Sequence, residues 1–256
     1  MPDEYTTLLE NNRVVQFVSR KFQVEDSAER LRLSDPYYRF CRIIELLKTA
    51  GVAPAESDTW LDLGCHHGQF LAVISRVHDG TWIGMDDWDL KAAMPFTSFR
   101  YYQTDLAGDE WPSYLRRESV RFVSALEVIE HMTDTDRFLR AVKCVSMPGA
   151  YLVLSTPNIN SLRNRVLVPF GVYPASLEYR NVIHHVRLFN LAKLKALLSE
   201  HGFVVRSCIG VSFLPERLLR FPVLRHVSEK LADAFPQLCG NIIVIAQRND
   251  GEIPSR

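Results

Sequence analysis

Residues 60–70 read WLDLGCHHGQF, and this stretch decides the fold that the sequence predicts. It begins with an apolar run at residues 60–63, which suits a buried strand, and passes through Gly64 and Gly68 into a helical pattern. Glycine allows a tight turn and lets a ligand approach the backbone closely. The N–H groups at the start of a helix can bind a carboxylate or a phosphate. The stretch therefore predicts a strand, a glycine loop and a helix that form one wall of a nucleotide-type site.

Further apolar runs resemble this first strand, and helical patterns lie between them. Branched and aromatic residues dominate the runs, as in strands that are buried on both faces. With the first strand, the runs span residues 59–64, 81–86, 99–105, 120–126, 150–156, 203–210 and 241–248. The alternation predicts an α/β fold with a doubly wound, mostly parallel sheet of seven strands.

Helical periodicity is clearest at residues 37–50 and 191–201, and Gly202 is placed to end the second helix. Thr133, followed by Asp136, predicts the start of another helix. The predicted organisation is a helical N-terminal extension at residues 1–50 and one α/β domain at residues 51–256. That domain carries two long insertions, at residues 157–190 and 211–240. Connections of such length tend to be lids or binding surfaces.

Composition narrows the class of protein. Lys and Arg number 30 and Asp and Glu also number 30, so there is no general positive field to hold nucleic acid, and we expect no nucleic-acid partner. The five cysteines are scattered and form neither a disulfide framework nor a zinc site. No targeting segment or stretch long enough to cross a bilayer is recognisable, which predicts a cytoplasmic protein.

The spacing of the glycine loop argues against two other nucleotide sites. A dinucleotide-binding loop has glycine at its first, third and sixth positions, but here the positions counted from Gly64 hold His66 and Gln69. The Gly-Lys-Ser/Thr pattern of a phosphate-binding loop is also absent. A nicotinamide-dependent oxidoreductase is therefore the less favoured alternative.

The chain resembles the class I S-adenosylmethionine-dependent methyltransferases over roughly residues 57–210. The segments that carry the resemblance are LDLGCHHG at 61–68, GMD at 84–86, TDL at 104–106, LEVIEH at 126–131, LSTPN at 154–158 and HHVRLF at 184–189, followed by Gly202-Phe203. Each is weak alone, but their order and spacing are those of the family. The most similar subfamily contains ubiquinone-biosynthesis O-methyltransferases and many natural-product and glycan methyltransferases. The resemblance implies a Rossmann-like fold and S-adenosylmethionine as the cofactor.

The resemblance also implies which residues bind that cofactor. They are Asp62, Gly64, Cys65, His66, Gly68, Asp86, Asp105, Leu106 and Leu126. Asp86 is expected to accept hydrogen bonds from the ribose hydroxyls, and Asp105 from the adenine amino group with Leu106 beside the ring. The glycine loop and Leu126 are expected to lie against the methionine portion, whose carboxylate Arg39 or Arg42 would reach.

Alternatives stay open for several of these residues. Asp62 fits a structural role of holding the amides of the loop, Asp87 competes with Asp86 for the ribose, and Asp105 fits a plain turn. His66 stands where the family usually has a small residue. It donates to the cofactor carboxylate, points away from the site, or marks a degraded site in a non-catalytic cofactor-binding or scaffold protein.

The residues Glu127, Glu130 and His131 follow the fourth strand at i, i+3 and i+4, so on a helix they would share one face. In ubiquinone-type enzymes similar residues surround a divalent metal, which implies a site for an ion such as Mg²⁺, with His184 or His185 as a further ligand. Alternatively His131, with Glu130 and His185, is a catalytic group that takes a proton from the acceptor. A purely structural role is the third possibility.

The two insertions predict the side of the molecule that meets the acceptor. Residues 157–190 mix aromatic and basic side chains, which suits a pocket for a small-molecule or glycan hydroxyl. Residues 211–240 are apolar with a basic side, which suits a membrane surface. Because Pro215 and Pro222 interrupt any long amphipathic helix there, a lid helix or a homodimer contact is the favoured alternative.

Overall fold

A computed structural model describes most of the chain. The described residues are 37–52, 55–66, 68–75, 78–87, 99–174, 185–214, 218 and 221–250. Of the predicted N-terminal extension at residues 1–50, only the helix α4 (Tyr37–Thr49) and Ala50 are therefore seen, and residues 1–36 lie outside the described part. Among the described residues, no helix is both long enough and apolar enough to cross a membrane.

The centre of the molecule is a seven-stranded sheet in the order β3-β2-β1-β4-β5-β7-β6. Its strands are β1 (Thr59–Leu63), β2 (Thr81–Asp86), β3 (Arg100–Gln103), β4 (Val120–Leu126), β5 (Ser146–Pro157), β6 (Phe203–Val211) and β7 (Asn241–Arg248). The pairs among β1 to β5 are parallel, whereas β7 runs antiparallel to both its neighbours. The predicted mostly parallel sheet of seven strands is thus confirmed.

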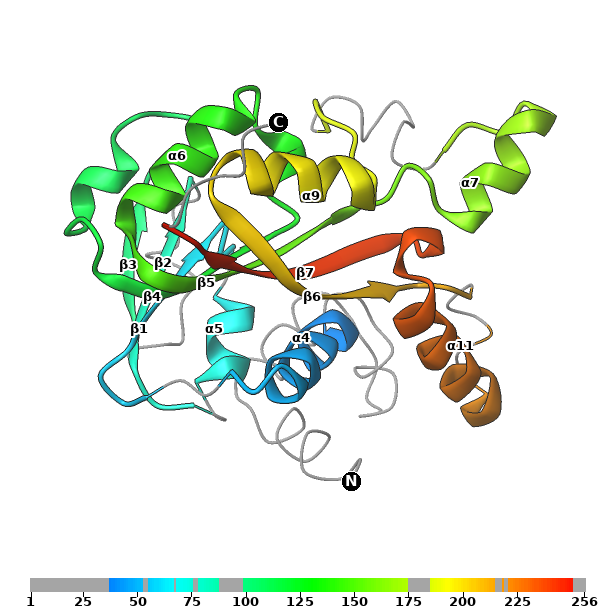
Figure 1. The fold of residues 1–256 in the computed structure, drawn as a ribbon, viewed down its shortest axis with the longest axis horizontal. Helices are drawn as coiled ribbons and strands as arrows, with labels where there is room; N and C mark the ends of the chain where they lie inside the picture. Colours follow the sequence, from blue (N-terminus) through cyan, green and yellow to red (C-terminus); the bar gives the residue numbers. More distant parts are fainter. Residues whose placement is uncertain are drawn as a thin grey trace.

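Helices cover both faces of the sheet (Figure 1). On one face, α4 and α5 (Gln69–Ile74) bury apolar side chains such as Ile43, Leu47 and Phe70 against the strands. On the other, α6 (Thr135–Val145) and α9 (Leu191–Glu200) do the same with Leu139 and Leu194. The sheet separates these two cores, so its central strands are buried on both sides, which explains why they read as continuous apolar runs.

A row of aromatic rings crosses the strands on the α4–α5 face. Trp82, Trp60, Phe122 and Tyr151 lie on β2, β1, β4 and β5, and successive ring centroids are 5.9, 4.8 and 5.7 Å apart. Neighbouring rings belong to directly paired residues. Cross-strand aromatic pairs stabilise a sheet in one register, so these rings help to fix how far β1 projects toward its glycine loop.

Capping side chains set where the helices of the other face begin. The Asp134 carboxylate accepts from the Arg137 N–H at 2.8 Å and caps α6, so the helix starts one residue later than a Thr133 cap would place it. The Asn190 side chain caps α9 in the same way through Lys193 N–H. Both caps satisfy N–H groups that have no partner within the helix.

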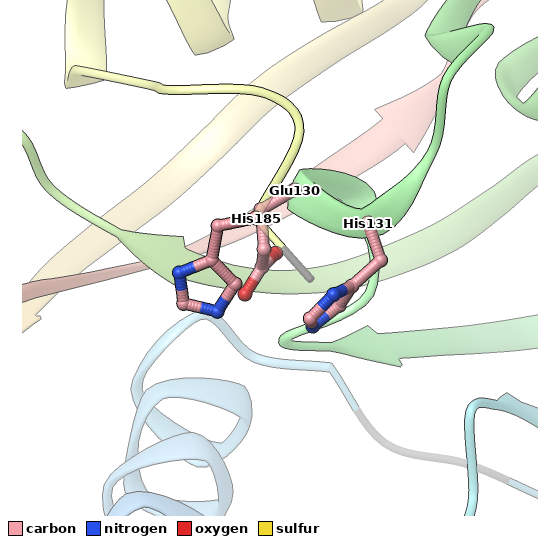
Figure 2. Close-up of side chains that lie close together, drawn as sticks. All are labelled: Glu130, His131 and His185. Atoms are coloured by element: carbon pink, nitrogen blue, oxygen red, sulfur yellow. The ribbon is translucent and has the colours of Figure 1, made fainter. Parts of the chain in front are cut away.

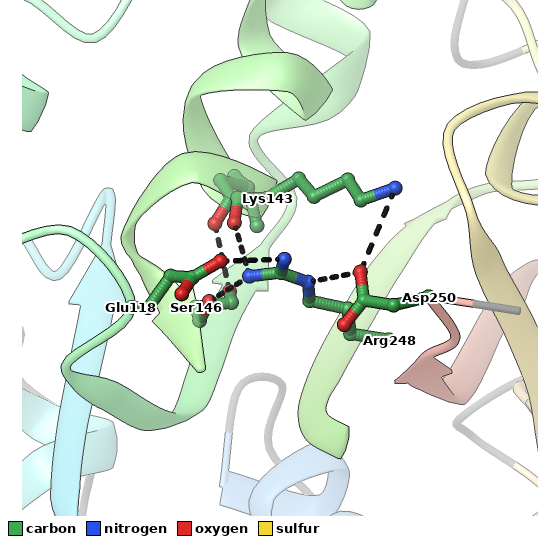
Figure 3. A network of polar contacts seen from close by, with 6 residues as sticks. Glu118, Lys143, Ser146, Arg248 and Asp250 are labelled. Carbon is green, nitrogen blue, oxygen red and sulfur yellow. Dashed lines mark hydrogen bonds and ion pairs between the residues drawn. The ribbon is translucent and has the colours of Figure 1, made fainter. Parts of the chain in front are cut away.

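At the edge of the sheet where β4 and β5 begin, Arg248 holds three elements together (Figure 3). Its guanidinium donates to the backbone carbonyls of Lys143 and Ser146 and to Glu118 at 2.8 Å. Its Nε donates to Asp250 at 2.9 Å. The end of β7 is thereby fixed to the end of α6 and the start of β5. We call this the amino edge of the sheet.

Four further elements lie within the insertions. The first insertion contains α7 (Leu162–Leu167) and the single-turn helix η3 (Val168–Phe170), and the second contains α11 (Pro222–Ala234) and η5 (Pro236–Leu238). Two further single turns, η1 (Trp111–Tyr114) and η2 (Ile129–His131), follow β3 and β4. Of the predicted acceptor segment, residues 175–184 lie outside the described part.

Candidate functional site

The order of strands locates the candidate site. From β1 the chain moves outward to β2 and β3, and then returns to β4 on the other side of β1. In open α/β sheets, ligands bind beyond the carboxyl ends of the strands at such a reversal, because the crossing connections diverge there and leave a crevice. We call this side of the sheet the carboxyl edge. The loops that follow β1, β2, β4 and β5 meet there.

The loop after β1 needs glycine at two positions. Gly64 and Gly68 have φ of +71° and +70°, a region that residues with a Cβ rarely adopt. A Cβ on Gly64 would lie 2.4 Å from Cγ2 of Val128, and one on Gly68 would lie 2.5 Å from Cζ of Phe99. The Gly64 N–H donates to Met85 O at 2.8 Å, which fixes the loop to β2. The two glycines therefore let this loop pack closely against Val128 and Phe99.

His66 also has a left-handed backbone, with φ of +46°. Its N–H donates to the Asp86 carboxylate at 2.7 Å, so the loop is bound to the end of β2 as well. Glycine is favoured in this conformation, which gives a physical reason why a small residue is usual at this place. His67 lies outside the described residues. A contact between the His66 side chain and the cofactor stays a prediction.

Asp86 and Asp87 put two carboxyl groups at the end of β2. Asp86 is only 8% exposed. A side-chain hydrogen bond with Asp86, burial and the negative charge of Asp86 raise the pKa of Asp87. This concentration of acceptor oxygens suits a ligand that presents hydroxyl groups, as a ribose does. The assignment of Asp86 rather than Asp87 to that role stays a prediction.

Asp105 forms a turn, which the sequence offered as the alternative to its predicted contact with the adenine. Its Oδ1 accepts from Ala107 N–H at 2.8 Å, and its backbone O accepts from Gly108 N–H at 3.1 Å. Leu106 is 8% exposed and packs in the core beneath α6. The turn leaves the second carboxylate oxygen of Asp105 for another donor, so the predicted contact with adenine is compatible with it. Leu126, at the end of β4, is partly buried against the α4–α5 core.

Asp62 is held by a neighbouring strand rather than by the glycine loop. It is 3% exposed and accepts from Ser124 Oγ on β4 at 2.5 Å. Burial, opposed by that hydrogen bond and supported by the charge of Asp86, raises its pKa to about 7. Cys65 is buried too, and its thiol pKa is raised well above the ordinary value, chiefly by burial. The described contacts of both side chains are with other residues of the chain, and their contact with the cofactor stays a prediction.

The segment after β4 does not form the regular helix on which Glu127, Glu130 and His131 would share one face. Glu127 has a left-handed φ of +57°, and only the single turn η2 follows. The Glu127 carboxylate accepts from Ser155 Oγ at 2.9 Å and pairs with Arg39 of α4 at 3.1 Å. Glu127 is thus bound to β5 and α4. The sequence contains no signal for this arrangement, because it joins three distant segments.

The Arg39–Glu127 pair also distinguishes the two arginines that were predicted to reach the cofactor carboxylate. The Arg39 side chain is 7% exposed and reaches the carboxyl edge through Glu127. Arg42 instead pairs with Glu45, at 2.8 Å, and with Asp233 of α11. Of the two arginines, Arg39 is therefore the one that lies at the candidate site.

Glu130, His131 and His185 form a compact group at the carboxyl edge (Figure 2). Ligand atoms of the three side chains all lie within 4.8 Å of one another, and the two imidazole centroids are 5.0 Å apart. His185 begins a segment that is attached to Glu130, because Arg187 N–H donates to Glu130 O at 3.0 Å. His184 lies outside the described residues.

Glu130 is the buried member of this cluster, with 1% exposure. Its Oε2 accepts from Thr156 Oγ1 of β5 at 3.1 Å, whereas its Oε1 has no hydrogen-bond partner among the described residues. Burial first, and then the negative charge of Glu127, raise the Glu130 pKa to about 8. A buried carboxyl group with a free oxygen can hold a proton near neutral pH, or bind a cation that would replace that proton.

A cavity of about 550 Å³ opens beside the end of β5. Its lining residues are Ile159, Asn160, Asn164, Arg165, Val168, Pro169, Gly171, Val172, Tyr173 and Pro174. Ile159 is tied to the His185 segment, since its N–H donates to Phe189 O at 2.9 Å. The volume lies within the usual range for small-molecule sites, which is roughly 300–1,000 Å³.

The sequence matches the family model of a methyltransferase domain over residues 36–207, which is more than half of the chain. The chain therefore belongs to this family, the S-adenosylmethionine-dependent methyltransferases. The match confirms the resemblance and its implied cofactor, S-adenosylmethionine, and removes the support for a nicotinamide-dependent alternative.

Two curated relatives are similar in sequence. A probable S-adenosylmethionine-dependent methyltransferase of Mycolicibacterium smegmatis is 31% identical over 155 residues, which are 59% of this chain and 54% of that protein. The human mitochondrial ubiquinone biosynthesis O-methyltransferase is 25% identical over 162 residues, which are 60% of this chain and 44% of that protein. The chain thus spans about half the length of the curated relatives it matches.

Solved structures share the fold. An S-adenosylmethionine-dependent methyltransferase from Mesorhizobium loti superposes with a TM-score of 0.55 at 16% identity, covering 84% of this chain and 98% of that one. One from Archaeoglobus fulgidus gives a TM-score of 0.54 at 21% identity, covering 91% and 98%. At these identities the likeness shows the Rossmann-like methyltransferase fold and leaves the acceptor open.

Proposed function

We propose that the chain transfers a methyl group from S-adenosylmethionine to a hydroxyl group of a small molecule, a secondary metabolite or a glycan. The supporting observation is the cluster of Glu130, His131 and His185, which brings two imidazoles and a buried carboxyl group together at the carboxyl edge. A hydroxyl group becomes a good nucleophile only as its proton leaves. A proton acceptor at this edge is therefore more useful for a hydroxyl acceptor than for one that is already nucleophilic.

S-adenosylmethionine, when bound, supplies a methyl group that its sulfonium already activates. The chain's part is to bind and orient, since alignment of the reacting groups supplies much of the rate in such a displacement. The site fits this cofactor, because Gly64 and Gly68 give the loop after β1 its left-handed turns and Asp86 offers a buried carboxylate. We assign the loop and Leu126 to the methionine portion, Asp86 to the ribose, and Asp105 with Leu106 to the adenine.

Two chemistries suit the cluster. In one, His131 takes the hydroxyl proton, because an imidazole titrates near neutral pH. In the other, the three side chains hold a divalent cation such as Mg²⁺, which would lower the pKa of a bound hydroxyl. The free Oε1 of buried Glu130 supports the cation, although two imidazole ligands suit Mn²⁺ or Zn²⁺ better than Mg²⁺.

The acceptor itself is proposed to enter from the side of the cavity beside β5. The wall of that cavity begins at Ile159, three residues after Thr156, whose hydroxyl donates to Glu130. Three residues of extended chain span about 10 Å. An acceptor of modest size can therefore occupy the cavity and reach the cluster.

We also propose a cytoplasmic location. None of the five cysteines forms a disulfide in the part of the chain that the structure describes, and two of them, Cys65 and Cys239, are buried. Free cysteines are the rule in a reducing compartment. Fractionation of cells that express the chain would test the proposal, which a secreted or periplasmic pool would contradict.

Two measurements test the function. Calorimetric titration with S-adenosylmethionine should show stoichiometric binding, and no binding at millimolar cofactor would refute the assignment. Transfer of a labelled methyl group is then measured on phenols, catechols and sugars, with amines and thiols as controls. Preferred labelling of amines would contradict the hydroxyl proposal, and binding without transfer to any acceptor would support the non-catalytic alternative.

Chelation separates the two chemistries of the cluster. If a cation is required, activity is lost in excess chelator and returns with Mg²⁺, Mn²⁺ or Zn²⁺. Full activity in excess chelator excludes the cation and leaves His131 as the proton acceptor.

A further inference from the structure

Exposed apolar side chains gather at one end of the molecule. Fifteen large apolar residues are exposed in the described part of the chain, and eleven of them fall within residues 162–173 and 221–235. We call these eleven the apolar end: Leu162, Val166, Val168, Phe170, Val172, Tyr173, Phe221, Val223, Leu224, Val227 and Phe235. They belong to α7, α11 and the residues beside them, and both helices project at the same end of the longest axis (Figure 1).

The largest exposures lie at the tips of these elements. Phe170 is 81% exposed, Val223 75% and Tyr173 72%. Phe170 ends η3 and is followed by Gly171, whose positive φ of +77° turns the chain sharply. Single exposed apolar residues are ordinary, but a concentration of them marks a surface that meets a partner or a lipid.

The first of these segments is locally positive, because residues 161–174 contain Arg163 and Arg165 and no acidic residue. The second, residues 221–235, is balanced, with Arg225 and Lys230 against Glu229 and Asp233. The whole chain has a formal net charge of zero, so the positive charge of the first segment is a local feature. A surface that combines exposed aromatic side chains with arginine side chains complements a lipid bilayer, which is apolar inside and can be anionic at its surface.

A second copy of the chain complements this end less well. A twofold interface places the same residues against one another. If it were built on residues 161–174, it would bring Arg163 and Arg165 of one copy toward the same arginines of the other. The acidic residues of the apolar end, Glu229 and Asp233, lie on α11 instead, and Asp233 already pairs with Arg42. Anionic lipid headgroups instead attract arginine, at about 1 kcal/mol for each residue near the surface.

We propose that the apolar end docks on a membrane surface that contains anionic lipids. Phe170, Tyr173 and Val223 enter the boundary between headgroups and acyl chains, and Arg163 and Arg165 meet the phosphates. The cavity beside β5 shares Val168, Val172 and Tyr173 with this surface, so docking turns the cavity toward the lipid. An amphiphilic acceptor could then enter it from the membrane, a step that rests on the proposed function, whereas the docking does not.

Vesicle co-sedimentation of the full chain tests the docking. The vesicles contain phosphatidylcholine alone or with added phosphatidylglycerol, and we expect binding to the second kind that weakens as salt is raised. Arg163→Gln and Arg165→Gln should each weaken it about fivefold. Phe170→Ser and Val223→Ser should each weaken it roughly tenfold, because each removes an apolar side chain that the docking would bury in the membrane.

The matched control is Val204→Ser, which changes an exposed valine on β6, outside the apolar end, and should leave binding unchanged. Equal loss in this control, or no binding to vesicles with phosphatidylglycerol, overturns the proposal. A concentration-dependent dimer in sedimentation velocity that Val223→Ser abolishes also overturns it, since a second copy would then cover this end. Titration with S-adenosylmethionine on every variant shows whether each remains folded, and it keeps failure of docking separate from failure of the proposed function.

Discussion

The two edges of the sheet hold their charged groups in opposite ways. At the amino edge, Arg248 meets two carboxylates and two backbone carbonyls, so its charge is balanced by direct partners. At the carboxyl edge, Asp62 and Glu130 are buried carboxyl groups whose pKa values are raised to about 7 and about 8. Groups with shifted pKa values concentrate at functional sites, because function and not stability selects them.

Backbone strain does not follow this division. His66 and Glu127 have positive φ at the carboxyl edge, where the loops after β1 and β4 converge, but Glu118, a partner of Arg248 at the amino edge, also has a positive φ of +51°. Each left-handed residue with a Cβ costs on the order of 1 kcal/mol, and such residues persist where their neighbours hold them in place. The two edges differ instead in their carboxyl groups, which are paired with Arg248 at the amino edge and buried at the carboxyl edge. Variants at the two edges should therefore change different properties.

The largest expected effect is on turnover at the carboxyl edge. His131→Ala should lower kcat by roughly 10²- to 10⁴-fold with the best acceptor found, because it removes either the proton acceptor or a cation ligand. The dissociation constant for S-adenosylmethionine should change little. His226→Ala, which removes an exposed histidine of α11, is the control and should retain activity with a soluble acceptor. Unchanged turnover in His131→Ala would show that the cluster of Glu130, His131 and His185 has only a structural role.

At the amino edge, a substitution of Arg248 should lower the stability of the fold. Arg248→Met leaves the carbonyls of Lys143 and Ser146 without this donor and separates Glu118 from its partner. We expect the free energy of unfolding to fall by about 2 kcal/mol in denaturant titration, with cofactor affinity unchanged. Arg206→Met removes one exposed hydrogen bond on neighbouring β6 and should cost no more than about 0.5 kcal/mol. Weakened cofactor binding in Arg248→Met would show that the two edges are coupled.

The strands could be predicted because a strand that is buried on both faces is a continuous apolar run in the sequence. The predicted spans 81–86, 120–126 and 241–248 agree with β2, β4 and β7 residue by residue, since each is an apolar run bounded by polar residues. The fifth strand begins at Ser146, earlier than the predicted residue 150, because Pro148 and the positive φ of Gly149 interrupt the pattern at a register shift against β4.

The site could be predicted only where one short segment forms it. The glycine loop and Asp86 lie where the spacing placed them, at the ends of β1 and β2. The partners of the acidic residues could not be read in the same way. Ser124 for Asp62, and Arg39 with Ser155 for Glu127, come from elements distant in sequence, and tertiary packing alone unites them.

A smaller effect concerns the pH dependence of stability. The Asp62 pKa rises from its usual 3.8 to about 7 on folding, so the folded chain holds a proton that the unfolded chain releases. Its contribution to stability is therefore present at low pH and is lost as pH rises from about 4 to about 7, by at most about 1.4 kcal/mol per pH unit.

Asp62→Asn keeps an oxygen for Ser124 but cannot ionise. Its unfolding free energy, relative to the natural chain, should increase between pH 5 and pH 6 by about 1.4 kcal/mol. Urea titrations of both proteins at the two pH values measure this difference, in which the other titrating groups cancel. A difference that stays constant with pH would show that folding does not raise the Asp62 pKa.

The smallest effect separates the backbone of His66 from its side chain. His66→Gly removes the cost of a left-handed residue with a Cβ, partly offset by the greater freedom of glycine in the unfolded chain, for a net gain of about 0.5–1 kcal/mol. His66→Ala loses the same imidazole but keeps the Cβ, so it should show no gain. Both variants should bind S-adenosylmethionine as the natural chain does if the imidazole points away from the site. Loss of affinity in both would identify the imidazole as a ligand of the cofactor, and the strain at His66 would then serve binding.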